Sequence, residues 1–97
     1  MPSDRFRLVK FRKSKTRGNK YDAIIQDITD MRQLIIPFGQ SVHAHYRDDT
    51  GLGLYSGLNH LDVKQRKNYL LRHEKTRHKK FSSSWFNSVY LWDGLKR

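Results

Sequence analysis

One strongly apolar segment, residues 85–92, decides where the core of this 97-residue chain must form. Trp85, Val89 and Trp92 follow one another at the i, i+4 and i+7 spacing of a single helix face. Further large apolar side chains flank this stripe, and the three serines at 82–84 are good helix N-caps. We therefore expect a helix that is buried, either on the rest of the chain or on a neighbouring molecule.

The first 38 residues alternate apolar and polar side chains, as β-strands do. We expect three antiparallel strands, over residues 6–11, 21–26 and 33–38. In the second of them, Tyr21, Ala23 and Ile25 share one face. A Gly-Asn pair signals a turn after the first strand, so residues 12–20 are expected to form a long basic hairpin tip. Pro37 lacks an N–H group, so the third strand either ends there or lies at a sheet edge.

Residues 39–59 are polar and contain four glycines, so we expect an irregular loop, with a short strand over 42–46 as an alternative. A loop of this length in a small domain is usually functional or packs on a partner. After it, Asp62 followed by Gln65 has the spacing of a capping box and predicts a helix from Val63 to about Thr76.

The apolar stripe of this helix is thin, and the rest of its surface is basic. Its stripe consists of Val63, Leu70 and Leu71, widened by Tyr69. The aromatic residues that we expect to pack the helices are Tyr69, Trp85, Phe86 and Trp92. The predicted fold is α+β in one domain: a small three-stranded antiparallel sheet followed by two helices. Its parts are a β-meander with a basic tip (1–38), a loop (39–59) and a two-helix segment (60–97).

Lys and Arg number 20 and Asp and Glu number 9, which gives a formal net charge of +11. The first 20 residues hold eight basic side chains and one acidic side chain. Residues 63–97 hold ten basic side chains and two acidic ones. Two basic lobes around an acidic middle indicate basic faces that bind phosphate backbones or acidic proteins. The residues predicted to contact such a polyanion or partner are Arg12, Lys13, Lys15, Arg17, Lys20, Lys64, Arg66, Lys67, Arg72, His73, Lys75, Arg77, Lys79 and Lys80.

The composition also excludes several classes of protein. There is no cysteine, so neither a disulfide scaffold nor a thiolate zinc site can form. No apolar run approaches the roughly 20 residues of a membrane helix. The first residues lack the apolar stretch of a secretory signal, so export is not expected.

An enzymatic alternative rests on His43, His45 and the Asp48-Asp49 pair, which could serve a metal-dependent nuclease. Adjacent aspartates more often form a turn and do not point the same way. We therefore expect no enzyme, no cofactor and no metal. Tyr21, Tyr46, Tyr55 and Trp85 could offer surfaces on which bases stack, although core packing is the better interpretation for the tryptophans.

Several short motifs occur in a particular order. They are Phe38-Gly39, His60-x-Asp62, Tyr69-x-x-Arg72-His73, and Ser82 to Phe86 leading to Leu91-Trp92. With this order and spacing, residues 34–93 resemble an uncharacterised family of small basic proteins of large DNA viruses and phages. Leu58-Asn59 replaces the family's Tyr-Thr pair. The resemblance implies a viral origin and no particular activity.

Two functions follow as expectations. The first is a non-enzymatic structural component of a virus particle, a minor capsid protein that bridges larger proteins with acidic surfaces through its basic lobes and aromatic helix. Such a protein would be found in the virion, and in the host cytoplasm or nucleus during assembly. The alternative is a nucleic-acid-binding module that contacts DNA or RNA phosphates without sequence specificity.

Overall fold

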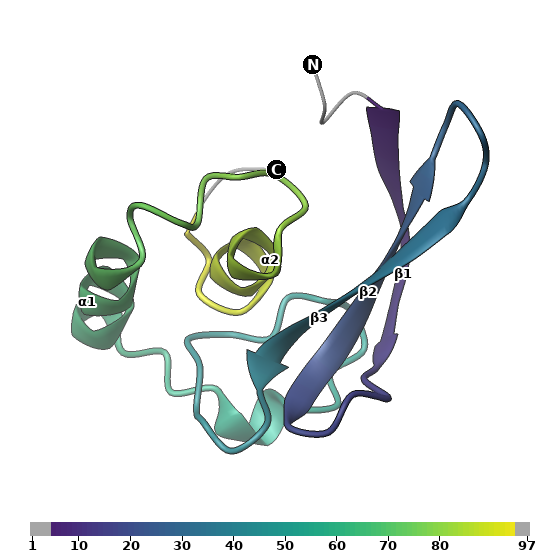
Figure 1. Cartoon of the computed structure of the whole chain (residues 1–97). Helices are drawn as coiled ribbons and strands as arrows, with labels where there is room; N and C mark the ends of the chain where they lie inside the picture. Colours follow the sequence, from purple (N-terminus) through teal and green to yellow (C-terminus); the bar gives the residue numbers. More distant parts are fainter. Residues whose placement is uncertain (1–4, 95–97) are drawn as a thin grey trace.

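The computed structural model describes residues 5–94, so the ends of the predicted segments, 1–4 and 95–97, lie outside the described part. Three strands come first: β1 (Phe6–Lys13), β2 (Asn19–Asp27) and β3 (Gln33–Gln40). They are followed by the 3₁₀ turn η2 (Ser56–Leu58), the helix α1 (Val63–Arg72) and the helix α2 (Ser83–Tyr90). The strands form an antiparallel sheet in the order β1-β2-β3 (Figure 1). The predicted α+β arrangement is confirmed.

The register of the sheet places the alternating apolar residues of all three strands on one face. Ala23 lies opposite Phe11 of β1 and Ile36 of β3, and Tyr21 lies opposite Phe38. The strands extend beyond the predicted bounds, and a bulge interrupts β1 between Leu8 and Lys10. β3 continues past Pro37 because β3 is an edge strand, where a missing N–H group disrupts no central ladder.

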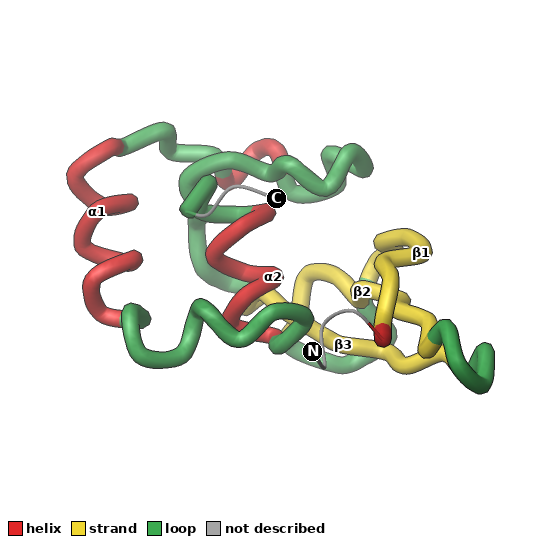
Figure 2. The backbone as a smooth tube through the Cα atoms, turned by 90° about the horizontal axis from the view of Figure 1, so that it is seen from above, coloured by secondary structure: helices red, strands yellow, loops and turns green. Residues whose placement is uncertain are grey.

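Helix α2 covers the apolar face of the sheet and lies between the sheet and α1 (Figures 1 and 2). The rings of Phe38 and Phe86 stack with centroids 5.5 Å apart, and Phe11 meets Phe86 edge-on at 6.0 Å. Ser82 is the N-cap, and its hydroxyl accepts a hydrogen bond from the Trp85 N–H. The apolar segment is therefore buried on the protein's own sheet, and Trp92 is buried beyond the end of the helix.

Gly39 is required where β3 passes under this segment. Its φ angle is +76°, and a Cβ atom there would lie 2.8 Å from Leu91 Cδ1. A side chain at this position would therefore combine backbone strain with a steric clash.

Helix α1 does not pack on the sheet and is attached to the chain that follows α2. Tyr69 stacks on Trp92 with centroids 4.2 Å apart and planes 4° apart, and Arg66 Nη2 donates to the Asp93 carbonyl at 2.7 Å. Asp62 caps the helix as predicted, accepting from the Lys64 and Gln65 N–H groups. Val63 and Leu71 of the thin apolar stripe are each 63% exposed, so the stripe as a whole does not pack against the rest of the protein.

The helix also ends earlier than expected, at Arg72 instead of Thr76. His73 is its C-cap, and its N–H donates to the Tyr69 carbonyl at 3.1 Å. Turns then lead to α2, and the Thr76 hydroxyl lies 3.1 Å from the Ser84 hydroxyl. The predicted helix running to residue 76 is therefore corrected, and Lys75 to Lys80 lie on the turns that follow it.

The loop between β3 and α1 is held by Asp48. Its carboxylate accepts hydrogen bonds from the Tyr21 hydroxyl, from the Thr50 hydroxyl at 2.7 Å and from the Tyr55 N–H at 3.3 Å. Asn59 Oδ1 lies 2.6 Å from His45 Nε2 and accepts from the Asp48 N–H at 2.8 Å. The alternative strand over 42–46 does not form, and this part of the loop makes only an isolated bridge between His45 and Asn59.

Candidate polyanion-binding surfaces

Most acidic side chains of the described residues are engaged by other groups of the protein, some of them at its surface. The ion pairs join Asp22 to Arg12 at 3.0 Å, Asp27 to Arg5 at 2.6 Å, Asp30 to Arg32 at 2.9 Å, Asp93 to Arg47 at 3.2 Å and Glu74 to Arg77 at 2.9 Å. Asp48 and Asp62 accept hydrogen bonds from the loop and from α1. The acidic middle of the sequence is therefore unavailable to neutralise the remaining lysines and arginines.

The environment of these carboxylates keeps them ionised. Hydrogen bonds from Thr29, together with the Arg5 guanidinium, lower the pKa of Asp27 to about 2. Hydrogen bonds from His78 and Arg77 lower the pKa of Glu74. The cations paired with these groups consequently stay neutralised near neutral pH.

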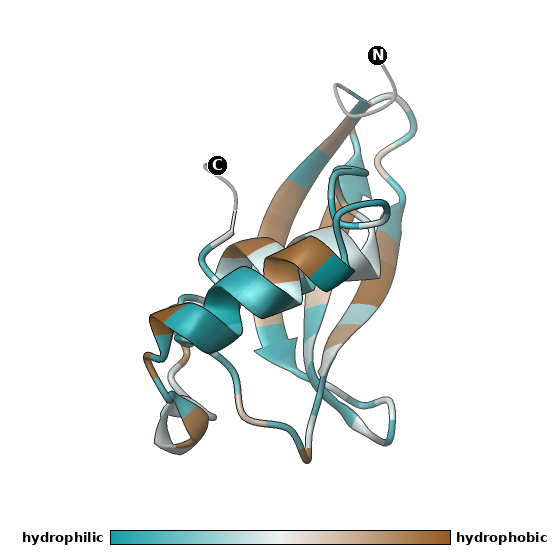
Figure 3. Ribbon diagram, turned by 90° about the vertical axis from the view of Figure 1, so that its left-hand side faces the viewer, coloured by the Kyte–Doolittle hydropathy of each residue, from teal (hydrophilic) through white to brown (hydrophobic). Residues whose placement is uncertain are grey.

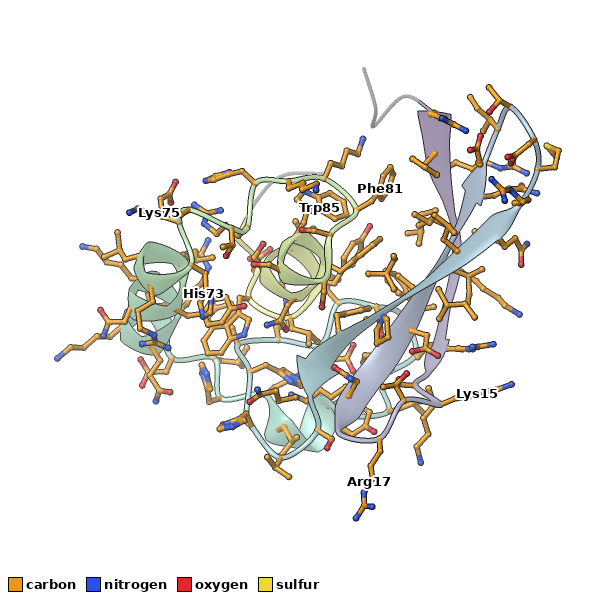
Figure 4. The ribbon with its side chains drawn as sticks, in the orientation of Figure 1. Lys15, Arg17, His73, Lys75, Phe81 and Trp85 are labelled. Carbon is orange, nitrogen blue, oxygen red and sulfur yellow. The ribbon has the colours of Figure 1, made fainter. Side chains whose placement is uncertain are left out.

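A first group of unpaired cations lies at the turn between β1 and β2, and we call Lys13, Lys15 and Arg17 the tip surface. All three are exposed and form no ion pair within residues 5–94. Asp22 fixes this turn, because its carboxylate accepts from the Ser14 hydroxyl at 2.6 Å and from the Lys15 N–H at 3.3 Å. Figure 4 shows that Lys15 and Arg17 point away from the sheet.

Two residues predicted for this surface are not free. The strands run to Lys13 and from Asn19, so the tip is shorter than the predicted span of residues 12–20. Arg12 therefore lies in β1 and pairs with Asp22, and Lys20 lies in β2 with 2% of its surface exposed. Lys20 Nζ donates a hydrogen bond to the His43 carbonyl at 2.6 Å, so the ammonium group is held within the protein and is not on the outer surface.

A second group of unpaired cations lies on and after α1. Lys64, Lys67, Arg72 and Lys75, which we call the helix surface, are exposed and form no ion pair in the part of the chain described. The outward side of α1 is mostly hydrophilic (Figure 3), and Lys75 points away from the body in Figure 4. Lys79 and Lys80 are exposed on the turn that precedes α2, and Lys80 Nζ lies 5.2 Å from the centre of the Phe81 ring.

Arg66 and Arg77 were predicted to contact a partner but are held inside the molecule. Arg66 Nε donates to the Trp92 carbonyl at 3.0 Å, and its guanidinium lies 5.6 Å from the centre of the Tyr46 ring. Only 11% of the Arg77 side chain is exposed, and it pairs with Glu74. His73 lies on the side of α1 that faces α2, with its ring 4.3 Å from the Tyr69 ring (Figure 4).

The aromatic residues lie in the core and not on either basic surface. Tyr69, Trp85, Phe86 and Trp92 are all buried, and so is Tyr21. The aromatic helix predicted to contact larger proteins is therefore occupied by contacts within this chain. Trp85 and Tyr21 are likewise not available for base stacking.

The residues of the nuclease alternative are bonded within the loop and do not form a metal site. His45 is buried beside Asn59, and Asp48 is bound to Tyr21, Thr50 and Tyr55. Within residues 5–94, no group of three or more His, Cys, Asp or Glu side chains is placed to hold a metal ion. The structure thus brings His45 and Asp48 near each other at Asn59 but does not build the group of ligands that the nuclease alternative needs.

Because Lys20 is buried, we expect the free energy of unfolding to change with pH in the alkaline range. Desolvation lowers the pKa of Lys20 from 10.5 to about 8, opposed by the nearby Asp48. Between these two values the unfolded chain binds more protons, so this group makes the free energy of unfolding rise with pH. Desolvation and the Asp48 contact raise the pKa of Tyr21 from 10.0 to about 12, so its contribution is lost as the pH rises from 10 to 12.

We therefore predict that stability rises above pH 8 and reaches a maximum near pH 10, measurable as urea midpoints between pH 8 and pH 12. In Lys20→Met the rise that begins near pH 8 should be reduced, while the loss above pH 10 should persist. The comparison with wild type separates Lys20 from the other lysines, which titrate in both proteins. Parallel curves for the two proteins between pH 8 and pH 10 would show that Lys20 is not desolvated.

Comparisons with family models, with curated proteins and with solved structures found no match to this chain. The resemblance to viral proteins therefore stays a prediction from the sequence. No helix within residues 5–94 is long and apolar enough to cross a membrane.

Proposed function

We propose that the protein is a non-enzymatic polyanion-binding protein that contacts the phosphate backbone of nucleic acid without sequence specificity. The observation that carries this proposal is the division of charge within the fold. Carboxylates pair with one set of arginines, and the cations of the tip surface and the helix surface are left without ion pairs in the described residues. Lysine and arginine side chains of this kind bind phosphates and release condensed counterions.

The position of the aromatic side chains favours nucleic acid over an acidic protein as the partner. Interface cores between proteins are enriched in Tyr, Trp and Phe. Here both tryptophans are buried in the fold, and the exposed side chains on and just after α1 include three lysines and an arginine. Contacts from such residues position a protein on the backbone and carry no information on base sequence.

A role as a structural component of a virus particle is the second part of the proposal. The tip surface and the helix surface lie at different ends of the molecule, so one copy can hold two polyanionic segments together (Figure 4). This arrangement suits a bridging protein of the virion, and the viral origin that the sequence resemblance implies is consistent with that setting. Mass spectrometry of purified particles tests this part, and repeated absence of the protein from them would contradict it.

Backbone binding is tested by fluorescence anisotropy with a short DNA duplex at increasing salt. The proposal predicts that log K falls linearly with log salt, with a slope of about −0.9 for each phosphate contacted. Duplexes of unrelated sequence should give the same curve, because backbone contacts do not read bases. Affinity that does not change between about 50 and 200 mM salt would rule out phosphate binding.

A further inference from the structure

A hollow lies between α1, the start of α2, the start of β2 and the end of β3. Its volume is about 820 Å³, within the roughly 300–1,000 Å³ that is typical of small-ligand sites. Gln65, Arg72 and His73 line it from the α1 side, and Asn19, Gln40 and His43 line it from the sheet side. These residues form no sequence motif, because they are spread between positions 19 and 73 and meet only in the folded chain.

The lining of the hollow is basic and contains no carboxylate. Lys20, Arg72 and two histidines contribute to it, and neither Asp nor Glu does. Arg72 is exposed and forms no ion pair within residues 5–94, so with no carboxylate in the lining it can attract an anionic group. The exposed Arg72 guanidinium offers several N–H donors in a fork that matches two phosphate oxygens.

Some polar side chains of the lining are bonded within the protein, such as Lys20 and Ser83, and others are not. The side chains of Asn19, Gln40, His43, Arg72 and His73 make no hydrogen bond with another described residue. Asn and Gln amides carry a donor and an acceptor side by side, which matches the hydrogen-bonding edge of a nucleobase. Cations and free amides in one hollow therefore suit a ligand that has both a phosphate and a base.

Hydrogen bonds and a ring contact join the elements that surround the hollow. Asn87 Nδ2 donates to the Tyr69 hydroxyl at 2.5 Å, and Tyr69 is stacked on Trp92. The Ser83 hydroxyl donates to the Pro37 carbonyl at 2.7 Å and ties the start of α2 to β3. A ligand would thus meet a site that is already formed, which reduces the ordering cost of binding.

We propose that this hollow binds one nucleoside monophosphate unit, with the phosphate on Arg72 and the base against the amide side chains. This inference rests on the proposed nucleic-acid function and adds a defined site to it. The unit belongs either to an unpaired nucleotide of a strand or to a free nucleotide, since both present the same groups. The tip surface and the outward lysines of α1 are not part of this site.

The test is a two-dimensional NMR titration of the full-length protein with adenosine 5′-monophosphate, in parallel with adenosine and with inorganic phosphate. We expect the nucleotide to shift the signals of Gln40, Arg72 and His73, with the two smaller molecules binding more weakly. Arg72→Gln should weaken nucleotide binding by about tenfold or more, because a charge-assisted hydrogen bond is removed. The matched control Arg7→Gln removes the same charge outside the hollow and outside both basic surfaces, and should change affinity by less than about twofold.

Equal weakening in both variants, equal affinity for inorganic phosphate, or shifts confined to the tip surface would overturn the inference. Competition with a single-stranded oligonucleotide identifies the source of the unit. If the oligonucleotide displaces the nucleotide, the natural ligand is an unpaired nucleotide of a strand. If the nucleotide stays bound, the natural ligand is a free nucleotide. Both results support the site. Salt-dependent duplex binding without any nucleotide binding would refute the hollow alone, whereas absence of both would also refute the proposed function.

Discussion

Replacing Phe86 by alanine should remove about 3–5 kcal/mol from the free energy of unfolding, because the ring lies at the centre of the core. Phe86 is fully buried. Its ring meets Phe38 at 5.5 Å, Phe81 at 5.9 Å, Trp85 at 5.0 Å and Tyr90 at 6.0 Å. A domain of this size has a total stability of about 5–15 kcal/mol, so the change removes a large part of it.

Urea unfolding followed by circular dichroism measures the effect. Val63→Ala is a suitable control, because Val63 is an exposed helix residue whose truncation should change stability by no more than about 0.5 kcal/mol. Should Phe86→Ala fail to fold, Phe86→Leu keeps part of the ring's volume and should give an intermediate, measurable loss. A loss in Phe86→Ala as small as that in Val63→Ala would show that α2 is not packed on the sheet.

Removing the outward lysines of the helix surface should weaken duplex binding by roughly a hundredfold or more at about 0.1 M salt. The triple variant Lys64→Gln, Lys67→Gln and Lys75→Gln deletes three exposed cations that lack ion pairs among the described residues. For every phosphate that the variant no longer binds, the magnitude of the salt slope should fall by about 0.9. Stability should change little, because these side chains lie at the surface.

The matched control is Arg7→Gln, Arg32→Gln and Arg47→Gln, which removes the same net charge. Arg7 donates to Gln26 at 2.7 Å, Arg32 pairs with Asp30 and Arg47 pairs with Asp93. Because these arginines are engaged within the fold, the control should keep most of the affinity and of the salt slope. Identical effects in the two triple variants would mean that total charge, and not the helix surface, governs binding.

Local sequence patterns predicted much of the fold, because the interactions behind them are local. Tyr21, Ala23 and Ile25 share the core face since side chains alternate along a strand. Asp62 and Ser82 cap their helices since a cap needs only a side-chain acceptor next to free N–H groups. The number and order of strands and helices followed from these signals.

Errors arose where a side chain's environment depends on distant parts of the chain. In the sequence, Lys20 looks like any other lysine of a basic run. In the structure, its ammonium group donates a hydrogen bond to the backbone carbonyl of His43 in the loop. Val63 and Leu71 fit an apolar stripe, but α1 is attached mainly through Tyr69 and Arg66 to residues 92 and 93. Nothing near these positions in the sequence shows how the helix is placed.

The candidate site was predictable to a similar degree. Exposed cations at Lys13, Lys15 and Arg17 follow from a hairpin tip, where side chains project into solvent. The sequence does not show which cations are paired and which are unpaired, because partners such as Arg5 and Asp27 meet only across the sheet. The hollow beside Arg72 escaped sequence reasoning for the same reason, since strands, loop and helices all contribute to it.

The most direct measurement of the central claim is an NMR titration of the protein with duplex DNA that identifies the amide signals that move. We predict that the shifts concentrate on Lys13 to Arg17 and on Lys64 to Lys75, and that they fade as salt is added. Shifts of the signals from the paired cations at Arg5 and Arg32 instead, or no shifts at all with stoichiometric duplex at low salt, would contradict the claim that the unpaired cations bind phosphate.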